Sequence, residues 1–272
     1  EFRVMARKII DMLQHLGSEA DFEPLTTAYA ETDIVKVVLL GIQCRRWPGN
    51  NELVLSAAQR VPELYVPFVG FDLDACGVDD LVRYRDDGFR GVKFIGPDQP
   101  YNHPDYMPVY EKACELGLPV LFHLGIVANK PSWSDVNSNN MRPIYLDHIA
   151  RGLPELTVIG AHLGNPWYEE ATMGCRWNAN LFYDLSGSTL KKKGPQFLGD
   201  LLWWSPESKP YTSPDGTCAW EKIIFGSDVA PALVADVISD YERLMDGLDL
   251  SPKLREDVWY GTGARILGLG EG

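Results

Sequence analysis

The chain has 272 residues, of which 45% are hydrophobic and 23% are charged, a composition typical of globular proteins and not of disordered ones. Its formal net charge of −13 argues against nucleic acids and anionic membranes as partners, because both repel an acidic surface. The five cysteines show no CxxC spacing and no apolar run approaches the ~20 residues of a membrane helix, so we expect a cytoplasmic protein without a disulfide framework.

The first apolar stretch, residues 7–13, is open to two interpretations. Met5, Ile9, Met12 and Leu16 follow helical spacing, which is compatible with an amphipathic helix. We favour a strand, because the segments that follow form a series of strands that lacks one member without it.

Seven further apolar runs are predicted as strands, and they alternate with longer amphipathic stretches. They span 35–40, 64–71, 91–95, 119–124, 156–162, 181–185 and 222–225. Near-continuous apolarity is typical of parallel strands that are covered on both faces. Helices are expected in between, among them 79–87, 106–116 and 144–151, each followed by a glycine that can end it.

Eight strands with interposed helices build either a doubly wound sheet or a closed barrel. The count of eight favours the barrel, and no GxGxxG motif follows the first strand to support dinucleotide binding. No repeat or linker divides the sequence. We therefore predict a single α/β domain over residues 1–272, a (β/α)8 TIM barrel, in which the irregular segments 126–141 and 203–220 are loops that shape a pocket.

Three polar residues stand at the ends of predicted strands. His123 and His162 end the fifth and sixth strands, and Asp228 follows the eighth. Taken singly, a strand-end histidine is more often a structural residue than a ligand, and an aspartate in a Gly-Ser-Asp turn is usually a cap. In a closed barrel, however, these strand ends meet over one mouth. Two imidazoles and a carboxylate there suit a divalent metal such as zinc and leave a position for water.

Several longer motifs extend over nearly the whole chain. They read IIDMLQHLGS from residue 9, GFRGVKF from 88, ELGLPVLFHLG from 115, MRPIYLDHIARGLPELTVIGAHLGNPW from 141, FYDLSG from 182, IIFGSDVAP from 223 and YGTGARILGL from 260. With these motifs the sequence resembles the amidohydrolase-related family of TIM-barrel enzymes, which includes aminocarboxymuconate-semialdehyde decarboxylase, resorcylate decarboxylases and lactone hydrolases. The block around the fifth and sixth strands is the most specific part of the resemblance.

The resemblance implies roles for particular residues. His15 and His123 would bind a metal, and Asp228 would bind it and also handle a proton. His162 would act as an acid or base beside it, with a role as a further ligand as the alternative. The family's opening strand carries two histidines, but here Leu13 stands in place of the first and cannot ligate a metal. We expect one divalent ion, zinc or else manganese, held more weakly than by a complete site. The alternative is a barrel that has lost its metal and kept its pocket.

Three further residues are predicted to bind substrate. Arg142 can pair with a substrate carboxylate through its planar guanidinium, or simply lie exposed at the start of a helix. Trp167 can form a wall of the pocket or belong to the core. Lys93 ends the fourth strand, where other amidohydrolase branches carry a carbamate that bridges two metals. The family named here does not normally use one, so we expect a buried or pocket-lining lysine. His103 and His148 are expected to be surface or capping residues.

The sequence thus predicts a metal-dependent hydrolase that cleaves a C–O or C–N bond, as in a lactone or amide, of a small carboxylate-bearing substrate. A non-oxidative decarboxylase that uses the same site is one alternative. Others are a metal-free hydrolase and a non-catalytic binding or scaffold barrel, which the ligand lost at Leu13 favours. A homodimer is a further interpretation, because Trp203, Trp204 and Trp220 in an irregular segment hint at an exposed apolar patch.

Overall fold

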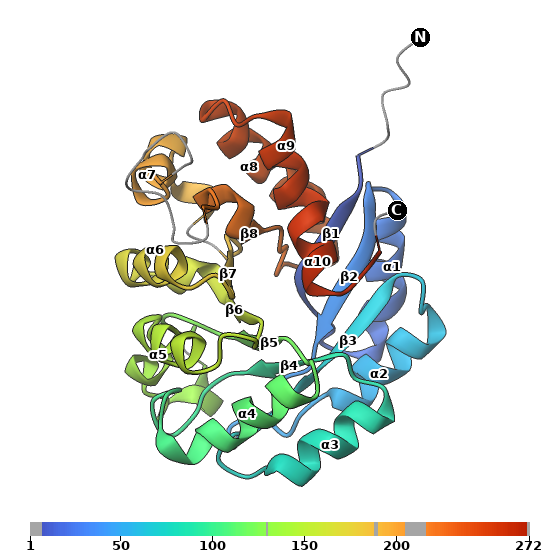
Figure 1. Ribbon diagram of the computed structural model, residues 1–272. Coiled ribbons are helices and arrows are strands. Elements are labelled where there is room, and N and C mark those ends of the chain that lie inside the picture. The colour runs from blue at the N-terminus through green and yellow to red at the C-terminus, as the bar shows by residue number, and fades with distance from the viewer. Residues whose placement is uncertain (1–6, 129, 188–189, 205–215, 271–272) are drawn as a thin grey trace.

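Eight parallel strands lie side by side in chain order in the computed structural model, which describes residues 7–128, 130–187, 190–204 and 216–270 (Figure 1). The strands are β1 (Ile9–His15), β2 (Ile34–Leu40), β3 (Tyr65–Gly70), β4 (Gly91–Phe94), β5 (Val120–Phe122), β6 (Val158–Gly160), β7 (Leu181–Asp184) and β8 (Ile223–Ile224). The last strand meets the first, since the Met12 N–H donates to the Phe225 carbonyl and the Asp228 N–H to the Leu13 carbonyl, both at 2.9 Å. The predicted TIM barrel is confirmed.

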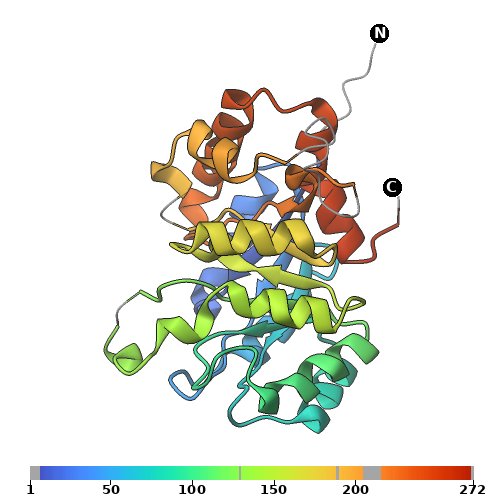
Figure 2. The ribbon, with the colours of Figure 1, turned by 60° about the vertical axis from the view of Figure 1, so that its left-hand side comes forward.

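Helices cover the outside of the strands (Figures 1 and 2). They are α1 (Phe22–Ala30), α2 (Asn51–Arg60), α3 (Val78–Asp87), α4 (Met107–Glu115), α5 (Ile144–Gly152), α6 (Tyr168–Trp177), α7 (Pro195–Leu201), α8 (Val234–Gly247), α9 (Pro252–Glu256) and α10 (Thr262–Ile266). Gly88 and Gly117 follow α3 and α4 in the left-handed conformation, as predicted, whereas Gly152 is itself the last residue of α5. None of the helices in the described ranges is long and apolar enough to cross a membrane.

The alternating directions of strand side chains produce two cores. The larger core lies between the strands and the surrounding helices, and a smaller one fills the inside of the barrel. The smaller core comprises Ile10, Met12, Leu13, Val38, Leu40, Phe68, Leu121, Ile159, Ala161, Ile224 and Ala264. Gly91 makes room for this core, because a Cβ there would lie 2.4 Å from the Phe68 ring. The filled interior confines accessible side chains to the mouths of the barrel.

The first predicted segment is a strand and not a helix, and β1 lies two residues further along the chain than predicted. Its pairing with β2 shifts by one residue between Asp11 and Gln14, so β1 carries a bulge. Beyond the bulge His15 pairs with Leu40, which belongs to the inner core. Because paired residues on parallel strands face the same way, His15 points toward the barrel axis, and Leu13 lies fully buried inside the barrel.

The predicted apolar patch at the three tryptophans is wrong for two of them. Trp204 is 0% exposed and Trp220 is 4% exposed, because both pack into the larger core, whereas Trp203 is 43% exposed. The middle of the predicted loop, residues 205–215, lies outside the described residues.

Candidate active site

Six polar side chains gather at the carboxyl ends of the strands, at one mouth of the barrel. We call them the mouth cluster: His15 at the end of β1, Lys93 in β4, His123 directly after β5, His162 after β6, Asp184 at the end of β7 and Asp228 after β8. Residues far apart in the sequence meet here because all the parallel strands end at the same edge of the barrel. The cluster includes every residue predicted from the sequence to bind a metal or to move a proton.

Asp228 lies between two histidines of the mouth cluster. Its Oδ1 is 3.8 Å from His15 Nε2, and its Oδ2 is 3.7 Å from His162 Nε2. The Asp228 side chain is 27% exposed, so a small molecule can reach it. Asp228 and His162 both have left-handed backbones, with φ of 47° and 61°, which costs on the order of 1–3 kcal/mol each. Such strain collects at functional sites, and here it affects the two residues predicted to handle protons.

His162 lies two residues beyond β6, in the short helix η5 (Ala161–Gly164), and not at the strand end as predicted. Its backbone N–H donates to Asp184 Oδ1 at 3.1 Å, and its Nδ1 lies 2.8 Å from Ser186 Oγ. The Ser186 hydroxyl donates its single proton to Asp184 Oδ1 at 2.5 Å, so its oxygen can only accept from Nδ1. The neutral imidazole therefore carries its hydrogen on Nδ1, and the lone pair on Nε2 faces Asp228.

Asp184 and Ser186 are positioning residues that sequence reasoning missed. Asp184 is fully buried, and its Oδ1 also accepts from the Ser186 N–H at 2.8 Å. Both residues stand in the FYDLSG motif at the end of the seventh strand. A carboxylate at the end of a barrel strand is the signal that could have identified the pair.

His15 and His123 present unprotonated nitrogens to the mouth. His15 Nδ1 lies 3.2 Å from the Leu40 carbonyl, which can only accept, so the lone pair is on Nε2. Desolvation lowers the pKa of His15 to about 4 against the opposing charge of Asp228, and it lowers the pKa of His123 well below the usual range. Both imidazoles are therefore neutral at pH 7, the form that binds metals. His123 Nε2 is buried without a hydrogen-bond partner among the described residues.

The mouth cluster contains donors for a divalent metal, but fewer than the family's opening strand would provide. His15, His123 and Asp228 offer two nitrogens and a carboxylate, a set that zinc accepts. Leu13 offers no donor. Within the described part of the chain, no three His, Cys, Asp or Glu side chains stand ready arranged to hold an ion. The types of donor thus suit a divalent ion, and three ligands would hold it more weakly than a complete set would.

Lys93 brings a positive charge into the mouth cluster. It pairs with Leu121 of the inner core, it is 1% exposed, and its Nζ has no hydrogen-bond partner among the described residues. Burial lowers the pKa of Lys93 to about 8, while the charges of Asp228 and Asp184 oppose the shift. At pH 7 the amine is thus still an ammonium. Lys93 is thus a buried lysine, as expected from the sequence.

The burial of Lys93 predicts how stability depends on pH. Its pKa is about 8 in the folded chain and 10.5 without burial, so below pH 8 the folded state carries the whole cost of the charge, about 3 kcal/mol. Between pH 8 and 10.5 Lys93 loses its proton in the folded state but keeps it in the unfolded state, so the cost of burying the charge decreases. Lys93→Met should therefore raise the Tm most at pH 7, and the gain should shrink toward pH 10.5. Calorimetry at the two pH values measures this, and a gain that does not vary with pH would contradict a buried ammonium.

Other predicted residues lie outside the mouth cluster. Arg142 bonds through two nitrogens to Glu170, and its guanidinium lies 5.1 Å from the centre of the Trp167 ring. A substrate carboxylate at Arg142 would have to displace Glu170, and substrate binding by Arg142 and Trp167 stays a prediction. His103 caps a short helix by accepting from a backbone N–H at 3.3 Å, and His148 is exposed on α5, as expected for both.

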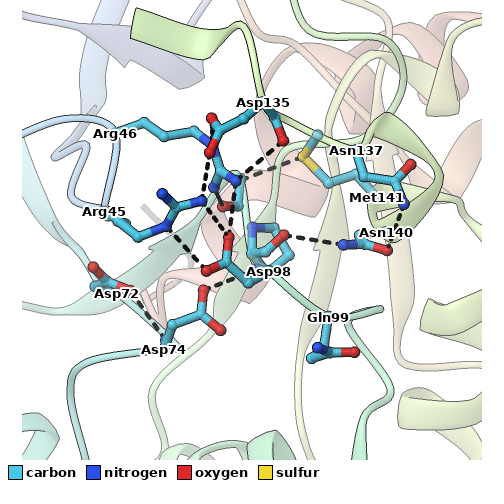
Figure 3. Close-up of polar contacts among 12 residues, drawn as sticks. Arg45, Arg46, Asp72, Asp74, Asp98, Gln99, Asp135, Asn137, Asn140 and Met141 are labelled. Carbon is cyan, nitrogen blue, oxygen red and sulfur yellow. Dashed lines mark hydrogen bonds and ion pairs between the residues drawn. The ribbon is translucent and has the colours of Figure 1, made fainter.

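An ion-pair network holds three loops together on the side of the barrel where the strands end (Figure 3). Arg45 and Arg46 follow β2, Asp98 follows β4, and Asp135 belongs to the predicted pocket loop 126–141. Each arginine bonds to both aspartates at 2.6–3.1 Å, and these bonds lower the pKa of both carboxyls. Because the loops come from different strands, the network fixes the rim of the barrel mouth.

Arg46 should matter more to this rim than Arg45. The Arg46 side chain is 5% exposed and also donates to the Gly96 carbonyl at 2.7 Å, whereas the Arg45 side chain is 53% exposed. We expect Arg46→Ala to lower the free energy of unfolding by about 1–2 kcal/mol and to speed proteolysis within 126–141. Arg45→Ala is the matched control, and it should destabilise the protein much less, because exposed ion pairs contribute little. Equal effects of the two substitutions would contradict this assignment.

Comparison with known proteins agrees with the fold. A family model described as amidohydrolase matches residues 12–269. Among curated proteins, no sequence matches this chain. Solved structures with the same barrel are similar over nearly their whole length, but their sequences differ widely from this one.

Three of these structures illustrate the similarity. An uncharacterised TIM-barrel protein from Bordetella bronchiseptica is 15% identical with a TM-score of 0.68, over 96% of this chain and 99% of that one. A probable 2-pyrone-4,6-dicarboxylic acid hydrolase from Acinetobacter baumannii, with citric acid bound, is 17% identical with a TM-score of 0.66, over 96% and 99%. A dihydroxybenzoic acid decarboxylase from Polaromonas, with bound manganese and an inhibitor, is 14% identical with a TM-score of 0.67, over 98% of each chain.

At these identities the similar structures support the fold alone, and the family rests on the sequence model. That model extends from β1 to the segment after α10 and so includes all six residues of the mouth cluster. The chain therefore belongs to the amidohydrolase family of TIM-barrel enzymes.

Proposed function

We propose that the protein is a hydrolase that cleaves a C–O or C–N bond, as in a lactone or amide, of a small carboxylate-bearing molecule. The observation that carries the proposal is the fixed orientation of His162. Ser186, which itself donates to Asp184, accepts its Nδ1–H, so its basic Nε2 faces Asp228, at 3.7 Å, over the accessible barrel mouth. An imidazole with its hydrogen on Nδ1 and a free Nε2 beside a carboxylate is a general base in position.

The residues divide the proton transfers between them. His162 Nε2 takes a proton from the attacking water, and the imidazolium that forms is stabilised by the Asp228 carboxylate. His162 then returns the proton to the leaving oxygen or nitrogen.

A divalent ion is part of the proposal, zinc first and manganese second. His15, His123 and Asp228 would hold it, since they present two neutral imidazole nitrogens and a carboxylate. When bound, such an ion supplies Lewis-acid polarisation of the substrate carbonyl. The family is metal-dependent, and the manganese in the similar Polaromonas structure supports a divalent ion as the cofactor.

Decarboxylation is the second candidate reaction, because the similar Polaromonas structure is a dihydroxybenzoic acid decarboxylase. The same acid/base pair would protonate the carbon from which CO₂ leaves. In both reactions the proposed substrate carries a carboxylate.

The experiment supplies two substrates side by side to protein equilibrated with zinc or with manganese. These are 2-pyrone-4,6-dicarboxylate, which a hydrolase opens, and a dihydroxybenzoate, which a decarboxylase converts. We expect ring opening that rises with added metal. CO₂ release without ring opening would replace the first candidate by the second. If neither reaction occurs with either metal, and other lactones and amides with a carboxylate are also inert, the enzymatic proposal is wrong.

A further inference from the structure

A cavity of about 510 Å³ lies at the end of the barrel opposite the mouth cluster. Among the residues that line it, Val66 is the second residue of β3, Arg90 directly precedes β4 and Pro119 directly precedes β5. Because the strands are all parallel, they start at one edge of the barrel and end at the other, where the mouth cluster lies. The cavity is therefore separate from the candidate active site.

The lining of this cavity is mostly apolar. The apolar lining residues that pack against the inner core and stay partly exposed are Val66, Ile266, Leu267 and Leu269. Cavities of about 300–1,000 Å³ with apolar walls and a few charged groups are typical of small-molecule sites. The lining thus suits the apolar body of an organic molecule.

Three arginines bring positive charge to the same cavity. Arg85 lies in α3, Arg90 lies between α3 and β4, and Arg265 lies in α10, far away in the sequence. All three residues are exposed, so an ion in solution can reach them. The chain as a whole has a net charge of −13 and repels anions, which makes this group of three guanidinium groups an exception on its surface.

Two of these arginines are weakly neutralised by the chain. Arg90 donates to the Phe89 carbonyl at 3.2 Å and forms no ion pair with any of the described residues. Arg85 pairs at 3.0 Å with Asp86, whose side chain is 62% exposed. Exposed ion pairs of this kind contribute little, so both guanidinium groups can take an anion from solution.

The third arginine shares its carboxylate with a lysine. Arg265 pairs with Asp257 at 3.3 Å, but Lys253 Nζ bonds to both oxygens of the same carboxylate, at 2.5 and 2.6 Å. One negative charge therefore serves two cations. The three arginines at the cavity thus carry more positive charge than the described carboxylates bonded to them neutralise.

We propose that this cavity binds a small organic anion, a carboxylate or a phosphate on an apolar body, with its charged head on Arg90 and Arg265. The planar guanidinium offers paired N–H donors that match the oxygens of either head group. The apolar body would pack against Leu267 and Leu269 at the base of the inner core. The site is separate from the mouth cluster, so the proposal goes beyond the proposed function and does not depend on it.

The test is calorimetric titration of protein equilibrated with zinc. Octanoate and octyl phosphate supply the two head groups on one apolar chain, octanamide is the neutral counterpart, and acetate and inorganic phosphate are the head groups alone. We expect octanoate or octyl phosphate to bind at least about tenfold more tightly than octanamide and than its own head group. The comparison of the two shows which head group the site prefers.

The double variant Arg90→Met/Arg265→Met should lose the preference for the anion over octanamide. Arg83→Met is the matched control, because Arg83 also lies in α3, is 58% exposed like Arg265 and does not line the cavity. It should keep the preference. Arg90→Met alone serves as a second variant if the double variant does not fold, which melting curves report, and it should weaken binding of the anion at least about threefold.

Three results would overturn the proposal. One is a wild type that binds neither anion more tightly than octanamide or than the head group alone. Another is an unchanged preference in the double variant, or in Arg90→Met where that replaces it, since the anion would then bind elsewhere, such as at the mouth cluster. The third is an equal loss in Arg83→Met, because the effect would then come from the general charge of the surface.

Discussion

Leu13→His should raise the affinity of the protein for zinc by at least about 100-fold. Leu13 stands inside the barrel in β1, and its Cβ would lie 3.1 Å from a Cβ on Gly226, the residue two before Asp228. An imidazole there would add a third nitrogen ligand to those of His15 and His123. Loss of a residue that only hydrogen-bonds a metal ligand lowers metal affinity about 10–100-fold, and a residue that binds the metal directly contributes more. Competition with a chromophoric zinc chelator measures the change.

The control for this gain is Met12→His. Met12 also belongs to the inner core, but its Sδ would lie 3.3 Å from a Cβ on Gly263 in α10, toward the opposite end of the barrel. An imidazole at Met12 should leave zinc affinity unchanged. If Leu13→His takes up no more zinc than Met12→His, the alignment that places Leu13 beside the metal ligands is wrong.

His162→Gln should lower kcat by about 10²–10⁴-fold, the usual contribution of a general base. Glutamine keeps a hydrogen-bonding side chain of similar size but cannot accept a proton. Ser186→Ala should have a smaller effect, about tenfold, because it removes the acceptor of Nδ1–H and leaves the imidazole free to take the other tautomer. Initial rates on the substrate that wild type converts give both values.

The matched control is His148→Gln, a histidine exposed on α5, which should leave kcat unchanged. The pH dependence of kcat separates a positioning role of Ser186 from a purely structural one. Ser186→Ala should shift the pH at which the general base of the reaction becomes protonated, which simple destabilisation would not do. If His162→Gln retains wild-type kcat, another group removes the proton and the role assigned to His162 is wrong.

The strands could be predicted because both faces of each are buried, which leaves continuous apolar runs in the sequence. The meeting of His123 and His162, whose ring centroids are 5.1 Å apart, followed from the rule that barrel strands end at one edge. The first segment could be assigned as a strand only by counting the strands that a barrel needs, since the spacing of its apolar residues also suits a helix. The bulge after Asp11 could not be predicted, because it appears only in the pairing with β2.

The details of the candidate site depended on contacts between distant segments. The orientation of His162 comes from Asp184 and Ser186, which approach it only because β6 and β7 are neighbours. The burial of Trp204 in the larger core could not be predicted, because the segment around it shows no hydrophobic periodicity. Local sequence thus predicted which residue types reach the mouth, and the neighbouring strands determine how each is held.

Equilibrium dialysis of the protein against zinc, for wild type and the variants His123→Ala, Asp228→Ala and His148→Ala, tests the central claim most directly, that the mouth cluster is a metal-assisted reaction centre. The account predicts about one bound zinc in wild type and in His148→Ala, and a large loss in the other two variants. No binding in wild type, or binding that survives both His123→Ala and Asp228→Ala, would contradict it.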